Sequence, residues 1–492
     1  MKNYAILNNV YFLGGFATMG GMLFGFDISS MSGVVGTQRY QDYFNHPKSS
    51  LQGGIVASMA AGSFCGALLA GPLGDKISRK RTIMLAAAIW IVGSIIQCAS
   101  VNVGMLIVGR IINGVAVGLA SMMVPIYQAE IAPKNIRGRI VSLQQWAITW
   151  GILIQYFIQY GASFIQSNAA FRIPWGIQVV PGVILLAGIS FFPYSPRWLA
   201  DKGRWDEALE VLANLRANGN KNDPAVQAEY KEIEDAVNFD RTLAARSYAE
   251  LFRPPALRRV FLGMSLQSWS QLTGMNVAMY YIVFIFQGAG ITGQNANLQA
   301  SSIQYVLNVV MTIPAILFID RWGRRPIYPM RIRSKAVSLS TASNWAFNFA
   351  LAYAVPPLLE SIQYRTYFIF AAFCVAMTIH VFFMFPETKG RTLEEMDELF
   401  NSDVPAWKTR SQPASHLDHD IEELKLNQDQ AAHHTDNRSS DSDSDHIHPH
   451  DSTIPPRVGD THPKMKEVPG EKTELPGERT EPPGEKTELE HL

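Results

Sequence analysis

The sequence predicts an all-α polytopic membrane protein, and two contrasting regions of the chain carry that prediction. Residues 10–385 hold repeated apolar runs of about 20 residues, the length that a helix needs to cross a bilayer. Residues 401–492 are almost entirely polar. Because lipid offers no hydrogen-bonding partner to an open backbone, each apolar run must be a helix. The formal net charge of zero averages over these two unlike regions and indicates nothing about partners.

The apolar runs divide into ten predicted spans. Gly and Pro are frequent inside them, and small residues let helices approach closely in lipid. All three cysteines fall in apolar runs, so we expect no disulfide framework among Cys65, Cys98 and Cys374. The predicted spans are 10–33, 53–73, 82–101, 104–127, 140–161, 173–193, 260–286, 301–319, 336–357 and 366–385.

Loop charge predicts how these spans are oriented. Lys and Arg are concentrated in loops 74–81, 128–139, 194–259 and 320–335. The loops on the opposite side hold four such residues between them, namely Arg39, Lys48, Arg172 and Arg365. Positively charged loops stay in the cytoplasm. Both termini are therefore predicted to be cytoplasmic, and we expect the protein in the plasma membrane.

Two polar regions lie outside the spans. Loop 194–259 contains "RWDEALEVLANLRA" and "PAVQAEYKEIEDAV", whose periodicity predicts short amphipathic helices beneath the membrane. A plain linker is the alternative. The tail at 401–492, with its Pro- and Gly-rich repeat from Pro469 to Leu489, is predicted to be a disordered cytoplasmic segment. Its histidines could bind metal weakly, but a spacer is the preferred interpretation.

Two charged residues stand inside the predicted spans. Asp27 in the first span and Arg110 in the fourth are the only Asp, Glu, Lys or Arg residues there. A lone charge at that depth costs at least about 2.5–3.5 kcal/mol, so such residues pair or face a cavity. The functional hypothesis is a proton-coupling pair, in which Asp27 takes up a proton when it loses its counter-charge. A fixed structural ion pair is the alternative.

Charged motifs recur in the loops predicted to be cytoplasmic. "GPLGDKISRKR" spans Gly71–Arg81 and "QAEIAPKNIRGR" spans Gln128–Arg139, and Asp320–Lys335 repeats the spacing of both in one stretch. A carboxylate that faces guanidinium groups forms a forked, breakable clamp, which suits a gate. The positive-inside signal alone does not explain the matched recurrence. The predicted gate residues are Asp75, Arg79, Glu130, Arg137, Asp320, Arg324 and Arg333.

Amides and aromatic residues within the spans form a third group. Asn and Gln hydrogen-bond to hydroxyl groups, and a Trp ring offers an apolar face, so the group suits a neutral, hydroxyl-rich solute. Any single member is more often a contact between helices. The predicted substrate-binding residues are Gln145, Gln271, Asn276, Tyr281, Asn308, Asn344, Trp345 and Asn348, with Tyr280 beside them.

The sequence lacks the motifs of the common enzyme classes. It shows no nucleotide-binding loop, no metal-ligand cluster in the spans and no nucleophile elbow. We therefore expect no catalytic residues, no metal and no cofactor.

These motifs together resemble the sugar porter family of the major facilitator superfamily, over about residues 10–400. The matching stretches are "FGFD" at Phe24–Asp27, "GDKISRKR" at Gly74–Arg81, "GRIINGVAVG" at Gly109–Gly118, "EIAPKNIRGR", "PYSPRWL" at Pro193–Leu199, "QLTGMNVAMYY" at Gln271–Tyr281, "DRWGRR", "SNWAFNF" at Ser343–Phe349 and "PETKG" at Pro386–Gly390. The sequence around Trp269–Tyr281 is similar to that of fungal hexose transporters.

The resemblance implies uptake of a hexose or similar monosaccharide by alternating access between two six-helix halves. It implies an N-terminal half at 1–193, a linker at 194–259 and a C-terminal half at 260–400. Asp27 and Arg110 match the proton-coupling pair of family members, and Ser270 replaces a frequent Gln. We expect a sugar, protons and lipid as partners, no nucleic acid, and a monomer. The matched sugar-contacting positions are Gln145, Gln271, Asn276, Asn308 and Asn348.

One spacing departs from the family. Asp75 and Pro133 lie 58 residues apart, whereas their counterparts Asp320 and Pro329 lie 9 apart. The difference of 49 residues is about two spans with a short hairpin. The sequence thus predicts ten spans, with the ninth and tenth helices of the family missing and residues 320–335 kept on the cytoplasmic side. A non-transporting sugar sensor and an inactive truncated relative are the alternatives to transport.

Overall fold

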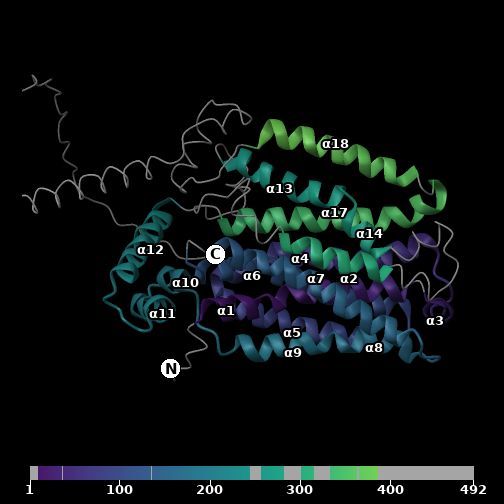
Figure 1. Cartoon of the computed structure of the whole chain (residues 1–492), viewed down its shortest axis with the longest axis horizontal. Coiled ribbons are helices and arrows are strands. Elements are labelled where there is room, and N and C mark those ends of the chain that lie inside the picture. Colours follow the sequence, from purple (N-terminus) through teal and green to yellow (C-terminus); the bar gives the residue numbers. More distant parts are fainter. Residues whose placement is uncertain are drawn as a thin grey trace, which may run out of the picture. The chain divides into compact units, whose positions relative to one another are not determined.

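The computed structural model describes residues 9–35, 37–133, 136–243, 256–281, 301–314, 333–362 and 365–385. Within these ranges the chain forms helices and no strand, and helical residues occupy all ten predicted spans (Figure 1). The seventh and eighth spans are described as far as residues 281 and 314. The stretch from 315 to 332, with Asp320 and Arg324, and the tail at 401–492 lie outside the described residues.

The helices are named in chain order. Those up to the linker are α1 (Val10–Ala17), α2 (Met19–Val34), α3 (Gln38–Tyr43), α4 (Ser49–Ile77), α5 (Arg79–Cys98), α6 (Val103–Ile131), α7 (Arg137–Ala162), α8 (Ala169–Ile177) and α9 (Val179–Ile189). Those that follow are α10 (Pro196–Asp201), α11 (Trp205–Ala217), α12 (Pro224–Leu243), α13 (Ala256–Leu272), α14 (Met275–Tyr280), a helix over 301–314, α17 (Arg333–Ile362) and α18 (Thr366–Met384).

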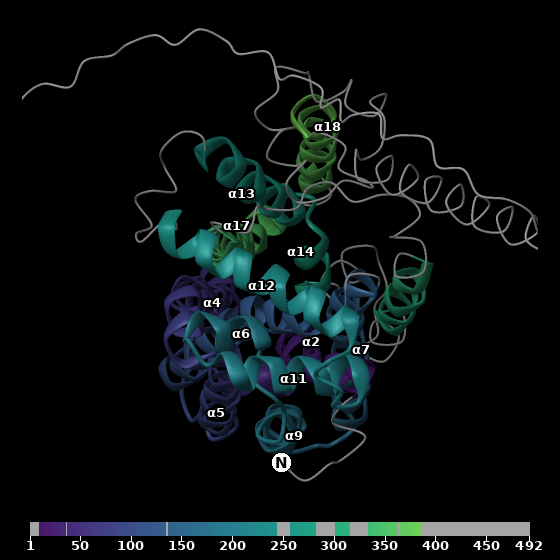
Figure 2. The same ribbon diagram turned by 90° about the vertical axis from the view of Figure 1, so that its left-hand side faces the viewer.

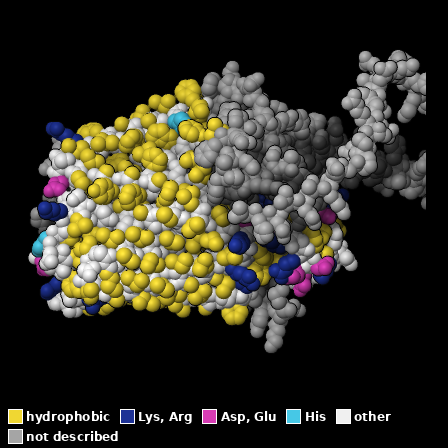
Figure 3. Space-filling model, turned by 180° about the vertical axis from the view of Figure 1, so that it is seen from behind, with side chains coloured by type: hydrophobic (Ala, Val, Ile, Leu, Met, Phe, Trp, Pro, Cys, Tyr) yellow, Lys and Arg dark blue, Asp and Glu magenta, His cyan; other side chains and the backbone are white. Residues whose placement is uncertain are grey.

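Six of the described helical segments are long and apolar enough to cross a membrane. α7 and α17 are also long, but they carry many of the Gln, Asn and Ser side chains of the bundle, which lowers their hydropathy. Figure 3 shows a broad hydrophobic face with charged side chains gathered toward its two ends. The six segments are Val10–Val34, Ser49–Ile77, Arg79–Cys98, Val103–Ile131, Ala169–Ile189 and Thr366–Met384.

Glycines allow a close contact between α4 and α6 in the first half. A Cβ at Gly62 would lie 2.2 Å from the carbonyl oxygen of Ile111, and one at Gly114 would lie 2.1 Å from that of Met59. Any larger side chain would push the two backbones apart. This is the small-residue packing by which helices associate in lipid.

A glycine also breaks the seventh span, between α13 and α14. Gly274 has a φ of +81°, a conformation that glycine adopts at little cost. A Cβ at this position would also lie 2.7 Å from the ring of Phe370 in α18. The break turns the chain between Gln271 and Asn276, so that both amides reach the same place.

The two halves meet along α4 and α17, which lie side by side (Figure 2). At the end of the bundle that holds α3, the α3 end, the Ser32 and Tyr305 hydroxyls are 2.9 Å apart. The ring of Tyr156 packs on that of Tyr305 there, with centroids 4.5 Å apart. A Cβ at Gly53 would lie 2.7 Å from the Tyr353 carbonyl oxygen. The α3 end is therefore tightly joined between the halves.

The opposite end carries α10, α11 and α12 and is called the linker end. Both helices predicted in the linker are present, as α11 and α12. Arg216 of α11 donates two hydrogen bonds to Glu229 of α12, at 2.8 and 2.9 Å, and a third to the Ile131 carbonyl at the end of α6, at 2.9 Å. Arg216 thus fixes the linker helices to the bundle.

Candidate functional site

A buried ion pair joins α2 and α6 of the first half. Asp27 of α2 and Arg110 of α6 are both fully buried, and the Arg110 Nη2 atom lies 3.1 Å from the Asp27 Oδ2 atom. The second pair of atoms, Nη1 and Oδ1, is 3.4 Å apart. The two charged residues singled out by the sequence therefore contact each other, as buried charges must unless each finds another partner.

Arg110 has further acceptors besides Asp27. Its Nε donates to the Ile55 carbonyl of α4 at 2.9 Å, and its Nη2 donates to the Val56 carbonyl at 3.2 Å. Arg110 thus has two backbone acceptors whose partial charge does not depend on the protonation state of Asp27.

Gln271 is the centre of an amide cluster in the second half. Its Nε2 donates to the Asn344 Oδ1 at 2.8 Å, and its Oε1 accepts from Asn276 at 2.9 Å and from Asn348 at 3.0 Å. α13, the start of α14 and α17 supply these four side chains. We call Gln271, Asn276, Asn344 and Asn348 the amide cluster.

Aromatic side chains connect the amide cluster to the first half. Trp345 of α17 lies edge-on to Phe24 of α2, with ring centroids 4.8 Å apart, and its Nε1 is 3.4 Å from the Ser121 hydroxyl of α6. Tyr280 belongs to α14, which packs against α2, the helix that carries Asp27. Trp345 and Tyr280 thus lie where the second half meets the helices of the ion pair.

Three of the predicted substrate-binding residues are not members of the amide cluster. Gln145 is exposed on α7, and no hydrogen bond joins it to the cluster within the described ranges. Tyr281 is buried and donates to the Ala352 carbonyl at 2.8 Å. Asn308 contacts the Met279 sulfur at 3.8 Å. A sequence pattern places each residue on a helix but not on a given side of the bundle.

Three of the predicted gate residues of the first half, Asp75, Arg79 and Glu130, form a cluster at the linker end. The Arg79 Nη1 lies 3.3 Å from the Asp75 carboxylate, and the Arg79 Nε lies 3.2 Å from the Glu130 carboxylate. Trp198 of α10 donates to the Asp75 carbonyl at 3.2 Å. Arg137 begins α7 nearby in sequence, and Arg333 is the first residue of α17, with a side chain outside the described set.

The structure also shows polar contacts between α13, α17 and α18 that the positions of Asp, Glu, Lys and Arg in the sequence did not indicate. Trp269 of α13 donates from Nε1 to the His380 Nδ1 of α18 at 2.9 Å. The Ser268 and Ser343 hydroxyls are 2.8 Å apart, between α13 and α17. His380 lies inside an apolar span. An ionisable residue in such a span is itself a sequence signal for a polar contact.

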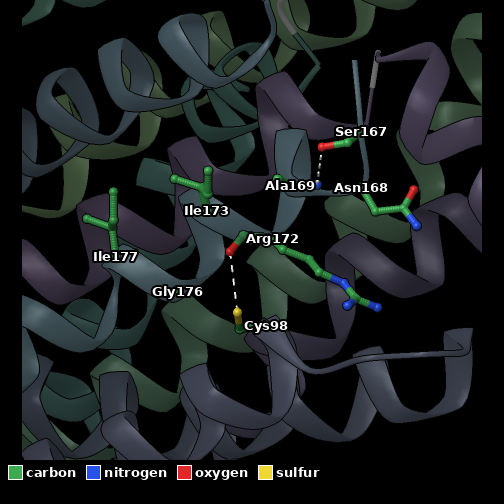
Figure 4. Close-up of a pocket in the computed structure, with 8 residues that line it drawn as sticks. All are labelled: Cys98, Ser167, Asn168, Ala169, Arg172, Ile173, Gly176 and Ile177. Atoms are coloured by element: carbon green, nitrogen blue, oxygen red, sulfur yellow. Dashed lines mark hydrogen bonds between the residues drawn. The ribbon is translucent and has the colours of Figure 1, made fainter. Parts of the chain in front are cut away.

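A surface pocket lies away from these groups, between the end of α5 and the start of α8 (Figure 4). The Cys98 thiol faces the Arg172 carbonyl oxygen there at 3.4 Å, and Ile173 and Ile177 line the apolar side. None of the predicted site residues lines it. The described residues also contain no group of three or more His, Cys, Asp and Glu side chains placed to hold a metal ion.

Comparison with known proteins assigns the family. The model of the sugar (and other) transporter family matches residues 14–328 and 327–400. The chain therefore belongs to this sugar transporter family of the major facilitator superfamily, with the all-helical fold described above.

Fungal transporters are among its relatives. The chain is 50% identical over 485 aligned positions to the MFS glucose transporter mfs1 of Aspergillus flavus, covering 81% of this chain and 91% of the relative. It is 43% identical to the high-affinity glucose transporter of Kluyveromyces lactis, covering 83% and 88%.

Solved structures show the same fold. The proton:xylose symporter XylE bound to 6-bromo-6-deoxy-D-glucose has a TM-score of 0.68 and 24% identity, covering 80% of this chain and 99% of XylE. The inward-open form of XylE from E. coli has a TM-score of 0.62 and 24% identity, covering 79% and 99%.

The family match breaks where the spacing predicted missing helices. Its two segments meet at residues 327 and 328, inside the short stretch between Asp320 and Pro329. The alignment with the Aspergillus flavus relative has 485 positions but includes only 81% of the 492 residues of this chain. At many aligned positions this chain therefore has a gap. The shorter second half is thus confirmed.

Proposed function

We propose that this chain carries a hexose or similar monosaccharide across the plasma membrane by alternating access, coupled to protons. The observation that carries the proposal is the amide cluster, whose helices pack against α2 and α6, the helices of the buried Asp27–Arg110 pair. A sugar binds through hydroxyl groups, and fixed amides offer both donors and acceptors to them.

The amide cluster is already linked by its own hydrogen bonds. A sugar that enters would replace the contacts of Gln271 with Asn276, Asn344 and Asn348 by contacts to its hydroxyls, so no buried polar group is left without a partner. Trp345 would offer its ring face, and Gln145, Tyr281 and Asn308 would join when the halves move. The fungal relatives are named as glucose transporters, which supports a hexose.

Asp27 is the proposed proton carrier and Arg110 its counter-charge. A shift of α2 against α6 within the first half would leave the Asp27 carboxylate without its cation, which favours the protonated form. The Ile55 and Val56 carbonyls would hold Arg110 meanwhile. Tyr280 would transmit the presence of a sugar to Asp27, because its helix α14 packs against both α17 and α2.

The gate is proposed to lie at the cytoplasmic side, which is the linker end. Asp75, Arg79 and Glu130 form a clamp there that can open and close, and Arg137, Asp320, Arg324 and Arg333 are its proposed partners. The excess of Lys and Arg in the loops of this end favours the same orientation, with both termini in the cytoplasm.

The test is uptake of labelled glucose in cells that lack their own hexose transporters, at one acidic and one neutral external pH. We expect uptake that is faster at acidic pH, and Asp27→Asn should remove that dependence. Gln271→Ala should lower uptake by at least about tenfold, because two or more hydrogen bonds to the sugar are lost. Gln227→Ala, an amide on the exposed linker helix α12, is the matched control.

No uptake by a correctly inserted protein would refute transport. Uptake that is the same at both pH values, and the same in Asp27→Asn, would refute proton coupling.

A second candidate function is a sugar sensor, which binds the sugar without transporting it. The chain is 31% identical to the high glucose sensor RGT2 of Saccharomyces cerevisiae and covers 60% of it. Glucose binding without uptake, lost in Gln271→Ala, would favour the sensor; absence of both would indicate an inactive relative.

A further inference from the structure

Two neighbouring helices of the first half expose apolar stripes that end at the same place. On α5 the exposed positions Leu85, Val92 and Ile95 follow one side of the helix, and Arg81 continues that side at the linker end. α9 packs beside α5, and the exposed stripe along α9 ends at Phe191, which is 72% exposed. In a membrane protein such a surface faces the acyl chains of lipid, so its end marks the depth of the headgroups.

Three cations gather around one tyrosine ring at that depth. The Lys80 Nζ lies 5.1 Å from the centroid of the Tyr194 ring, and the guanidinium carbons of Arg81 and Arg204 each lie 5.8 Å from it. Tyr194 itself stacks on Trp198, with centroids 5.5 Å apart. We call Lys80, Arg81, Tyr194 and Arg204 the Tyr194 cluster.

The positive charge of the Tyr194 cluster is only partly neutralised. Arg204 pairs with Glu207, with the Nε and Oε1 atoms 2.7 Å apart. Lys80 donates to the Ser190 carbonyl at 2.8 Å, and within the described ranges no carboxylate lies at ion-pair distance from Lys80 or Arg81. Cations that repel one another yet converge on one ring favour an anion between them.

We propose that the Tyr194 cluster binds the headgroup of an anionic phospholipid from the cytoplasmic leaflet. Its phosphate would lie against Lys80 and Arg81, and its acyl chains would follow the exposed stripe through Leu85 and Val92. Basic residues at the cytoplasmic headgroup level recognise anionic lipids in this way. The lipid would join the start of α5, the end of α9 and the residue before α11. The choice of leaflet depends on the orientation given under the proposed function.

The proposal is tested on the purified full chain in detergent, without sugar and without uptake, so its failure is distinct from failure of transport. Short-chain phosphatidylserine and short-chain phosphatidylcholine are added at equal concentrations, and the melting temperature is measured. Phosphatidylserine should raise the melting temperature by at least about 3 °C more than phosphatidylcholine. The Lys80→Gln/Arg81→Gln double variant should lose that difference.

Lys202→Gln is the matched control, because Lys202 is an exposed cation of the same region that pairs with Asp201 at 3.3 Å and is not on the Tyr194 ring. It should keep the difference. Equal shifts with the two lipids, a difference retained in the double variant, or the same shift with inorganic phosphate alone would each overturn the proposal.

A measurement on the wild-type protein covers the case of a double variant that does not fold. Native mass spectrometry after incubation with both lipids should show retained phosphatidylserine in at least about threefold excess over phosphatidylcholine, since the headgroups differ in net charge. Equal retention of the two lipids would overturn the proposal.

Discussion

The two halves of this transporter differ most at their last spans. In Ala169–Ile189, which ends the first half, 44% of the apolar window is buried, whereas in Thr366–Met384, which ends the second half, none of it is. The two spans hold equivalent places in a fold built from two related halves. The missing ninth helix accounts for this difference, because in the first half its counterpart α5 packs along α8 and α9.

The difference shows what the first half uses to hold itself together. It contains a buried ion pair and a glycine-lined contact in which the α4 and α6 backbones nearly touch. In the second half, neutral hydrogen bonds such as those of Ser268 with Ser343 and Trp269 with His380 join the described helices. Lipid supplies no hydrophobic drive for helices to associate, so packing and polar contacts decide stability.

The largest effect is expected from breaking the buried ion pair. Arg110→Gln leaves the Asp27 carboxylate buried without a cation, which should lower the free energy of unfolding by about 3–5 kcal/mol. Asp27→Asn/Arg110→Gln should recover most of that loss. For comparison, Ser343→Ala in the second half should cost about 1 kcal/mol. Denaturant unfolding in detergent measures all three, and a double variant no better than Arg110→Gln would contradict this account.

Glycine packing gives the next effect. Gly114→Val places a side chain where even a Cβ would be 2.1 Å from the Met59 carbonyl oxygen. The valine should force α4 and α6 apart and lower the free energy of unfolding by about 3 kcal/mol. Ala372→Leu on the exposed side of α18 should change the unfolding free energy by no more than about 0.5 kcal/mol. Similar melting temperatures for the two variants would show that the halves are equally packed.

Restoring the missing hairpin tests the comparison directly. The segment of the Aspergillus flavus relative that has no counterpart in this chain between Asp320 and Pro329 would be inserted after Pro326, at the junction of the two family matches. The insertion should cover α18 and the helix over 301–314, and uptake of labelled glucose should rise by about tenfold, a change of roughly 1.4 kcal/mol in the barrier. Unchanged uptake with correct membrane insertion would show that the shorter second half does not limit the rate of transport.

Much of this fold was predictable, because spans, turns and charges are local features of the sequence. Asp27 and Arg110 could be paired from sequence alone, since two buried opposite charges leave each other few alternatives. The contact of Ser32 with Tyr305 could not, because neutral side chains 273 residues apart give no local signal of their pairing. The sequence likewise indicated Gln271 but not its role as the centre of three amides, which depends on the turn at Gly274.

The smallest effect is expected from breaking the hydrogen bond between Trp269 of α13 and His380 of α18. His380→Leu removes the acceptor of the Trp269 Nε1 proton. The free energy of unfolding should fall by about 1 kcal/mol, because the indole N–H is left without a hydrogen-bond acceptor. His380→Gln, whose side-chain oxygen can accept the same proton, should lose less. Both unfolding in detergent and Trp fluorescence can be followed. In the variant with the restored hairpin, α18 would gain further contacts, so His380→Leu should then cost less. An equal cost in both backgrounds would show that α18 is already held as firmly as the last span of the first half.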